Sequence, residues 1–261
     1  MTKYFKILKL ISKQNNKIYN LTNQSFCQIL FGKISYIFTP VFILLGISAN
    51  IITLFNFIIS ILMGIFITIG NDYYFYTGIS LYFLCRILDY SDGAVARYHN
   101  NSTFYGRYID GLADIFLNSF LIFSISIYSY QIFNQLSLII FGCLTAILTT
   151  FDSFIYDRYS ALIRWSNEEN NKKMLPYVKK KFLPNLPKIY NDIYTLLIFS
   201  LFFSQNENNL LFILFVSIFF TFSLSALQTF FVHQYFAYLN MNSNAKVKNS
   251  AKKTKKTKNK Y

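Results

Sequence analysis

Residues 51–69 read IITLFNFIISILMGIFITI, and no side chain in this run is charged. A helix rises about 1.5 Å per residue, so a run of this length matches the hydrocarbon core of a bilayer, which is about 30 Å thick. The run therefore predicts a helix that crosses a membrane. An apolar stretch before it, residues 37–47, is short for a span and contains Pro40 and Gly46. We expect that stretch to lie in the membrane interface.

Further apolar runs predict an all-α membrane protein with about six transmembrane helices. Their approximate bounds are 73–95, 105–128, 136–163, 190–203 and 210–238. The composition agrees, because 54% of the 261 residues are hydrophobic, only 14% are charged, and the mean hydropathy is +0.34. Soluble domains carry about 25% charged residues. The composition therefore excludes an ordinary soluble domain.

The net charge of +14 would suit a nucleic-acid-binding protein, but its distribution does not. Lysine and arginine gather in the N-terminal region, the turn between Arg97 and Arg107, the loop 164–188 and the tail 246–260. The alternate connections, 71–72, 130–134 and 204–209, contain neither residue. This bias predicts that both termini face the cytosol, where basic segments contact membrane lipids. No nucleic-acid partner is expected, and a prokaryotic plasma membrane is the simplest location.

The domain organisation predicted from these patterns has three parts. Residues 1–48 begin with MTKYFKILKLISK, which is basic and amphipathic but lacks the features of a signal peptide, and they form an interfacial segment. Residues 49–240 form the six-helix membrane domain. Residues 241–261 form a polybasic, disordered cytosolic tail.

Acidic residues cluster where one predicted span ends and the next begins, in the stretch 88–116, LDYSDGAVARYHNNSTFYGRYIDGLADIF. Helical spacing places two sets of residues, each on one face of its helix. The sets are Asp89, Asp92 and Ala96 before the turn, and Gly106, Asp110 and Asp114 after it. The connection is short, so we expect the two helices to be antiparallel neighbours. Four carboxylates would then converge at the cytosolic ends of two spans.

Carboxylates at membrane depth are costly and repel one another, so they indicate a bound cation. Oxygen ligands suit Mg²⁺ or Mn²⁺, and no cysteine or histidine cluster points to zinc. Gly93, Ala96 and Gly106 leave room beside the acids. Arg97 and Arg107 are placed to hold a diphosphate. The alternative is a structural network in which the acids pair with Arg86 and these two arginines.

The string Asp89-x-x-Asp92-Gly93-x-x-Ala96-Arg97, followed after eight residues by Gly106-x-x-x-Asp110-x-x-x-Asp114, resembles the signature of the CDP-alcohol phosphatidyltransferases at every fixed position. Asn50-x-x-Thr53, at the start of the first span, is similar to a pair that these enzymes often carry. The resemblance implies a six-span phosphotransferase with an interfacial N-terminal helix. It also implies a homodimer.

The roles that the resemblance implies are specific to residues. One or two divalent ions on the CDP diphosphate would be held by Asp89, Asp92, Asp110 and Asp114, with Asp114 also the general base. The CDP site would be lined by Gly93, Ala96, Arg97 and Gly106. Asn50 and Thr53 would touch the nucleotide, or alternatively cap the first span.

The acceptor is not identified by any motif. Arg158 and Arg107 are candidates for binding it, and Arg158 has the alternative of pairing with Asp157 or Asp152. We expect CDP-diacylglycerol as donor and a small polar hydroxyl acceptor, in phospholipid biosynthesis. The alternatives are a soluble CDP-alcohol with a lipid acceptor, a divalent-metal transporter, or a scaffold without catalysis.

Overall fold

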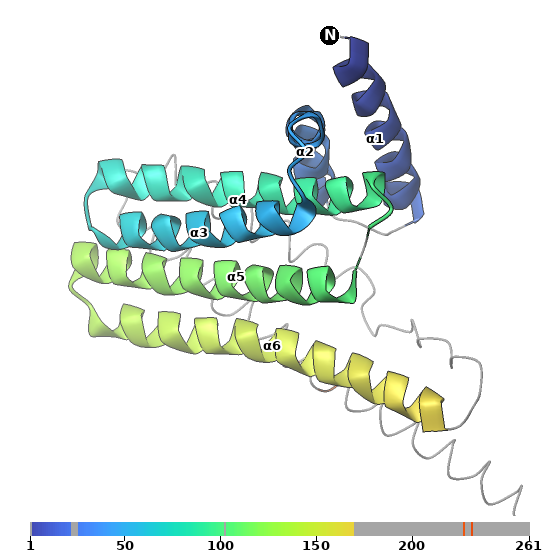
Figure 1. Ribbon diagram of the computed structural model, residues 1–261. Helices are drawn as coiled ribbons and strands as arrows, with labels where there is room; N and C mark the ends of the chain where they lie inside the picture. Colours follow the sequence, from blue (N-terminus) through green and yellow to red (C-terminus); the bar gives the residue numbers. More distant parts are fainter. Residues whose placement is uncertain (1, 22–25, 102, 170–226, 228–230, 232–261) are drawn as a thin grey trace, which may run out of the picture. The chain divides into compact units, whose positions relative to one another are not determined.

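The computed structural model describes residues 2–21, 26–101, 103–169, 227 and 231. Within these ranges every regular element is an α-helix (Figure 1). The helices, in chain order, are α1 (Thr2–Leu21), α2 (Phe26–Leu44), α3 (Ala49–Thr68), α4 (Asp72–Tyr98), α5 (Phe104–Phe133) and α6 (Leu136–Glu169). The predicted all-α class is confirmed.

The chain divides into two compact units. The first contains α1 to α5 and the beginning of α6, up to Thr150. The second contains the described end of α6, from Phe151 onward. All of the acidic residues singled out in 88–116 therefore belong to the first unit.

Helix α3 lies between α4 and α5 (Figure 1). Both of these helices pack extensively against α3 and only slightly against each other. They are antiparallel, as the short connection between them predicts. They meet directly through side chains, as Phe75 and Tyr128 do, but most of the packing of each helix is against α3.

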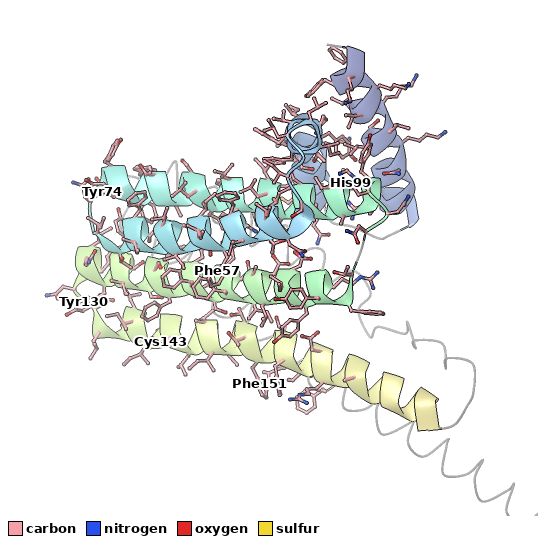
Figure 2. The ribbon with its side chains drawn as sticks, viewed as in Figure 1. Phe57, Tyr74, His99, Tyr130, Cys143 and Phe151 are labelled. Atoms are coloured by element: carbon pink, nitrogen blue, oxygen red, sulfur yellow. The ribbon has the colours of Figure 1, made fainter. Side chains whose placement is uncertain are left out.

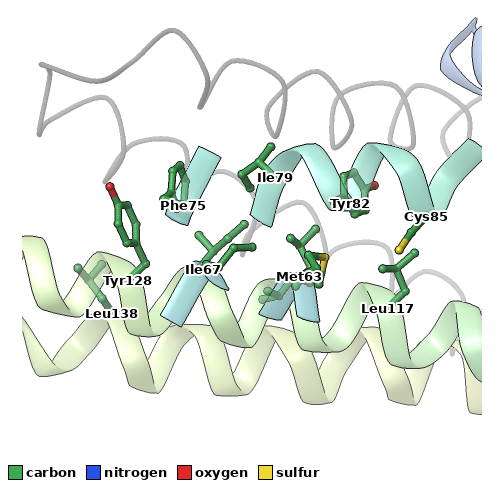
Figure 3. Packing of buried hydrophobic residues seen from close by; sticks show 12 residues of the cluster. Met63, Ile67, Phe75, Ile79, Tyr82, Cys85, Leu117, Tyr128 and Leu138 are labelled. Carbon is green, nitrogen blue, oxygen red and sulfur yellow. The ribbon is translucent and has the colours of Figure 1, made fainter. Parts of the chain in front are cut away.

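A large buried cluster holds this unit together (Figure 3). It combines Met63 and Ile67 from α3, Ile79 and Tyr82 from α4, and Leu117 with others from α5. Such interdigitated packing, and not burial away from water, is the main force between helices in a membrane. The cluster fixes the positions of α3, α4 and α5 relative to one another.

Polar contacts join α4 and α5 at the end of the bundle opposite to the acidic stretch. The Tyr128 hydroxyl donates to Asp72 Oδ1 at 3.0 Å, and the Tyr128 ring stacks on Phe75 with a centroid separation of 4.0 Å (Figure 3). Gln131 Nε2 donates to the carbonyl oxygen of Thr68 at 3.0 Å. These contacts connect the end of α5 to the ends of the other two helices.

The N-terminal helix α1 is amphipathic, as predicted. Ile7 and Ile11, one helical turn apart, are buried against Tyr36 of α2 and Ala94 of α4. The side chains of Lys3, Lys6, Lys9 and Lys13 are exposed. The basic face of α1 is therefore attached to the same end of α4 that carries the acidic residues.

Helix α2 is longer than the apolar stretch 37–47 suggested. The helix begins at Phe26, well before that stretch, continues through Pro40 and ends at Leu44. Gly46 follows with a φ of 69°, the left-handed conformation that glycine adopts readily after a helix. In Figure 1 α2 is seen almost along its axis, so it crosses α4 steeply. This orientation agrees with an interfacial position for α2 if α3, α4 and α5 span the membrane.

Four of the described helical segments are long and apolar enough to cross a membrane: Phe26–Leu44, Ala49–Thr68, Phe104–Phe133 and Leu136–Ile155. Helix α4 is not among them, because its tyrosines and charged residues lower its hydropathy. The predicted spans at 190–203 and 210–238 lie outside the described residues apart from positions 227 and 231, and the tail 241–261 lies wholly outside them.

Candidate metal site

The acidic residues meet at one end of the bundle, where α3 begins, α4 ends and α5 begins. His99 follows the end of α4 there (Figure 2), and Asn100 adopts a φ of 52° as the chain reverses. Thr103 then caps α5, because its Oγ1 accepts a hydrogen bond from the Gly106 N–H at 3.0 Å. This cap fixes where α5 begins. It therefore also fixes the position of Asp110, in the second turn of α5, along the axis of α4.

Three carboxylates form a group that could hold a metal ion. Each of Asp89, Asp92 and Asp110 offers a carboxylate oxygen, and these oxygens lie within 4.8 Å of one another. Their charges also act on one another across the two helices. Hard oxygen donors without cysteine or histidine fit Mg²⁺ or Mn²⁺. The donor set therefore fits the divalent ion expected from the sequence, although it does not distinguish between the two ions.

Asp92 is the most tightly held member of the group. Its side chain is only 4% exposed, and its Oδ2 accepts a hydrogen bond from Thr53 Oγ1 on α3 at 2.6 Å. A hydrogen bond to a ligating carboxylate orients it and keeps it charged. The structure thus gives Thr53 a contact that the sequence did not suggest, since nothing along the chain connects two residues on different helices.

Thr53 and Asn50 do not cap α3. The residue at the cap position is Ser48, and its side chain makes no capping hydrogen bond. Asn50 and Thr53 lie within the helix, where Thr53 Oγ1 also lies 3.1 Å from the carbonyl oxygen of Ala49. The capping alternative is therefore wrong, and both side chains belong to the face of α3 that meets the site.

Asp114 is not a member of the three-carboxylate group, but it lies close enough for its charge to act on Asp89 and Asp110. Its Oδ1 forms an ion pair with Arg86 Nη1 at 3.4 Å. The Asp114 side chain is 41% exposed, whereas the Arg86 side chain is 13% exposed. The structural network considered from the sequence is thus present for the pair of Asp114 and Arg86, and the charge of Arg97 acts on Asp110. Whether Asp114 also binds metal remains the prediction of the family resemblance.

The small residues of the motif lie where space is limited. A Cβ atom on Gly106 would lie 3.1 Å from Thr103 Oγ1 and 3.3 Å from Asn50 Oδ1, so α5 and α3 come together at this glycine. A Cβ atom on Gly93 would lie 3.0 Å from Arg97 Nη1, which places the guanidinium of Arg97 beside Gly93. Ala96 and Arg97 are both half-buried.

The two candidate acceptor residues lie in different units. Arg107 is exposed in the first turn of α5. Arg158 belongs to the second unit, is also exposed, and its guanidinium lies over the Phe154 ring at 5.0 Å from the centroid. This contact is a cation–π interaction, and among the described side chains Arg158 forms no ion pair with Asp157. The side chain of Asp152 lies outside the described part of the chain.

Thr53→Val is expected to weaken Mn²⁺ binding by about tenfold or more, since loss of a hydrogen bond to a ligand typically costs 10–100-fold in metal affinity. Valine has nearly the same shape but lacks the hydroxyl that donates to Asp92. Thr53→Ser keeps the hydroxyl and should bind Mn²⁺ like the unmodified protein. Electron paramagnetic resonance of titrated Mn²⁺ would measure both. Equal affinity in the two variants would contradict a role for this hydrogen bond.

Residues 46–166 match the family model described as CDP-alcohol phosphatidyltransferase. The matched range includes α3, α4 and α5 and all four aspartates of the motif. A search among curated proteins found no match. The family is generally dependent on divalent metal, and a membrane family together with four apolar helices indicates an integral membrane protein. Residues 46–166 are therefore identified as a CDP-alcohol phosphatidyltransferase domain, and the members of that family are transferases that act on a CDP-alcohol donor and an alcohol acceptor.

Proposed function

We propose that this protein transfers a phosphate-linked group from CDP-diacylglycerol to a small polar hydroxyl acceptor in phospholipid biosynthesis. The observation that carries the proposal is the group formed by Asp89, Asp92 and Asp110 at one end of a bundle of apolar helices. A membrane-embedded helix rarely carries such acids without function. The family match supports the reaction type, and the position of the group near a helix end suits a donor with a lipid part and a water-soluble part.

The reaction forms a bond between the acceptor oxygen and the phosphorus that carries the alcohol group. The bond from that phosphorus to the bridging oxygen of the diphosphate breaks, and CMP leaves with the electron pair. We assign Asp114 as the base that takes the acceptor proton, because its side chain is 41% exposed and can be reached by the acceptor. One or two ions bound by Asp89, Asp92 and Asp110, with Asp114 as the fourth ligand, would neutralise charge on the diphosphate.

The remaining residues bind and orient the donor in this proposal. Arg97, beside Gly93, and Arg107 offer guanidinium groups to the diphosphate oxygens. Gly106 lets α5 approach Asn50 closely, so that both residues can meet the nucleotide. Thr53 keeps Asp92 oriented. Arg158 is assigned to the acceptor on its exposure alone.

We further propose that the site faces the cytosol. The exposed lysines of α1 belong to a helix whose buried face packs on Ala94, near Asp92, so they lie at the site's end of the bundle. Positively charged segments remain on the cytosolic side of a membrane. The basic residues of 164–188 and 246–260 favour the same side. CMP would then be released into the cytosol.

The function can be tested by measuring CMP release from the purified protein in lipid nanodiscs. CDP-diacylglycerol would be offered with Mg²⁺ or Mn²⁺ and a panel of hydroxyl acceptors, including glycerol 3-phosphate, inositol and serine. We expect acceptor-dependent CMP release that stops when EDTA is added. Release only from a soluble CDP-alcohol with a lipid acceptor would reverse the assignment of the lipid substrate. Metal transport into liposomes without CMP release from either donor would refute the proposal.

A further inference from the structure

The apolar face of α1 is occupied by the protein itself. Ile7 is 4% exposed and Ile11 is 1% exposed, and both pack with Tyr36 of α2 and Ala94 of α4. An amphipathic helix that lies on a bilayer ordinarily buries this face among the lipid acyl chains. In α1 the face is not available to lipid. Any contact of α1 with the membrane therefore has to use the other side of the helix.

That other side carries a row of cations. Lys6, Lys9 and Lys13 follow one another at i, i+3 and i+7, so they lie in one narrow strip that faces away from the buried isoleucines. All three side chains are exposed, and among the described residues no ion pair involves them. Helix α1 contains no acidic residue. This lysine strip is therefore a surface of uniformly positive charge.

Exposed apolar side chains border the lysine strip on both sides. Phe5 is 57% exposed and Leu10 is 48% exposed, and at 3.6 residues per turn they lie on opposite edges of the strip. Cations between apolar side chains suit the headgroup region of a bilayer, where lysines meet phosphates and the apolar side chains reach the acyl chains. An acidic protein would match only the charges. The pattern therefore favours an anionic lipid surface.

A hydrogen bond keeps the beginning of α1 near the level of the lipid. The Tyr4 hydroxyl donates to the carbonyl oxygen of Ile37 on α2 at 3.0 Å. Around that point α2 exposes apolar side chains, since Ile37 is 58%, Phe38 40% and Val41 43% exposed. Exposed apolar side chains that lie together are typical of a surface that contacts lipid. The lysine strip is thus attached close to the place where the lipid headgroups begin.

We propose that the lysine strip of α1 binds the headgroups of anionic phospholipids, and that this charge contact, in place of insertion of an apolar face, attaches α1 to the membrane. The strip belongs to a helix that packs on Ala94, between Asp92 and Arg97 of α4, so the bound lipids lie beside the donor site. CDP-diacylglycerol is itself an anionic lipid. As a consequence that rests on the proposed function, the strip also gathers the donor near the site.

Binding is tested by amine labelling of the full-length protein in nanodiscs. Nanodiscs of phosphatidylcholine alone are compared with nanodiscs that contain equal amounts of phosphatidylcholine and phosphatidylglycerol, which is anionic. A water-soluble reagent modifies exposed lysines, and mass spectrometry measures the rate at each position. We expect phosphatidylglycerol to slow labelling of each lysine of the strip by about fivefold, the stabilisation typical of a lysine near an anionic surface. High salt should remove this protection.

Two triple variants separate charge from shape. Lys6→Gln/Lys9→Gln/Lys13→Gln removes the charges and keeps long polar side chains, whereas the corresponding triple substitution by arginine keeps the charges. Hydrogen exchange of the backbone of α1 should be slower with phosphatidylglycerol than without it in the original protein and in the arginine variant. In the glutamine variant the two nanodiscs should give the same exchange rates.

Several outcomes would overturn the proposal. Equal lysine labelling in the two nanodiscs would show that anionic lipid does not bind the strip. Equally strong protection of α1 in phosphatidylcholine alone would show that apolar contacts attach the helix. Protection by inorganic phosphate added to phosphatidylcholine nanodiscs would show that the strip collects soluble anions and not lipid.

The gathering of donor is tested by kinetics, with CDP-diacylglycerol as the only anionic lipid in the nanodiscs. The glutamine variant should raise the donor KM by about fivefold or more and leave kcat within about twofold of the original. An unchanged donor KM would refute this consequence. Absence of CMP release by the unmodified protein would refute the proposed function instead, and the labelling result would still decide whether the lysine strip binds anionic lipid.

Discussion

Asp110→Asn is expected to lower CMP release by at least about a thousandfold. Asparagine keeps the shape of the side chain but removes one of the three charges that surround the candidate ion. A catalytic metal contributes several kcal/mol to transition-state stabilisation, and each 1.4 kcal/mol or so corresponds to a factor of ten. The measurement is kcat in nanodiscs at saturating Mn²⁺, together with the Mn²⁺ affinity, which should also fall.

Asp72→Asn provides a matched control for this substitution. Asp72 is also an aspartate of the bundle, but it lies at the opposite end of α4, about 30 Å from Asp92 at 1.5 Å per residue. It contacts Tyr128 and has no place in the site. We expect its kcat to be unchanged. Similar activity losses in the two variants would show that the charge of Asp110 acts on folding, and would contradict its assignment as a ligand.

Gly78→Val is expected to produce the largest loss of stability. A Cβ atom at this position of α4 would lie 2.9 Å from the carbonyl oxygen of Met63 and 3.1 Å from the backbone nitrogen of Ile67, both on α3. Backbone atoms cannot move aside as side chains can, so the two helices would have to separate. Overpacking of this kind costs about 1–3 kcal/mol or more. A lowered midpoint of thermal unfolding in detergent would measure it.

Gly111→Ala is the corresponding control, because no neighbouring atom lies within 4 Å of a Cβ atom at Gly111. Alanine also favours a helix over glycine by about 1 kcal/mol. This variant should therefore unfold at the same temperature as the original protein or slightly above it. If Gly78→Val unfolded at that temperature too, the close approach of α4 to α3 would not be important for stability.

The helices of the bundle could be predicted from the sequence because apolar runs and their interruptions are local features. The run 51–69 corresponds to α3, Ala49–Thr68, within two residues at its start and one at its end. Helix α2 was recognised only in part. Lys33 and the polar residues near Ser35 interrupt the apolar pattern at its beginning, and Pro40 suggested a break that the helix accommodates.

The packing of the helices could not be predicted in the same way. A short connection shows that two helices are antiparallel, but it does not show what lies between them. The packing of α3 against α4 depends on small residues such as Gly78, which lets α4 approach the backbone of Met63. Such contacts join residues that are far apart in the sequence, and the spacing of residues along one helix does not indicate them.

The candidate site was predictable to the extent that helical spacing determines it. Asp89 and Asp92 share one face of α4, and Asp110 meets them from α5, as expected. The hydrogen bond of Thr53 to Asp92 and the pairing of Arg86 with Asp114 decide how the carboxylates are oriented. Both contacts are between helices, and spacing along a single helix cannot indicate them.

The position of α3 between α4 and α5 has a consequence for ion selectivity. The carboxylates of the group come from α4 and α5, yet the separation of those two helices depends on the side chains of a third. Mg²⁺ requires oxygens at about 2.0–2.1 Å, whereas Ca²⁺ is bound at about 2.3–2.6 Å. If the group binds a divalent ion as proposed, α3 would therefore help to set the ion size that fits, although it contributes no carboxylate to the group. Bulk added along α3 would widen the gap and favour the larger ion.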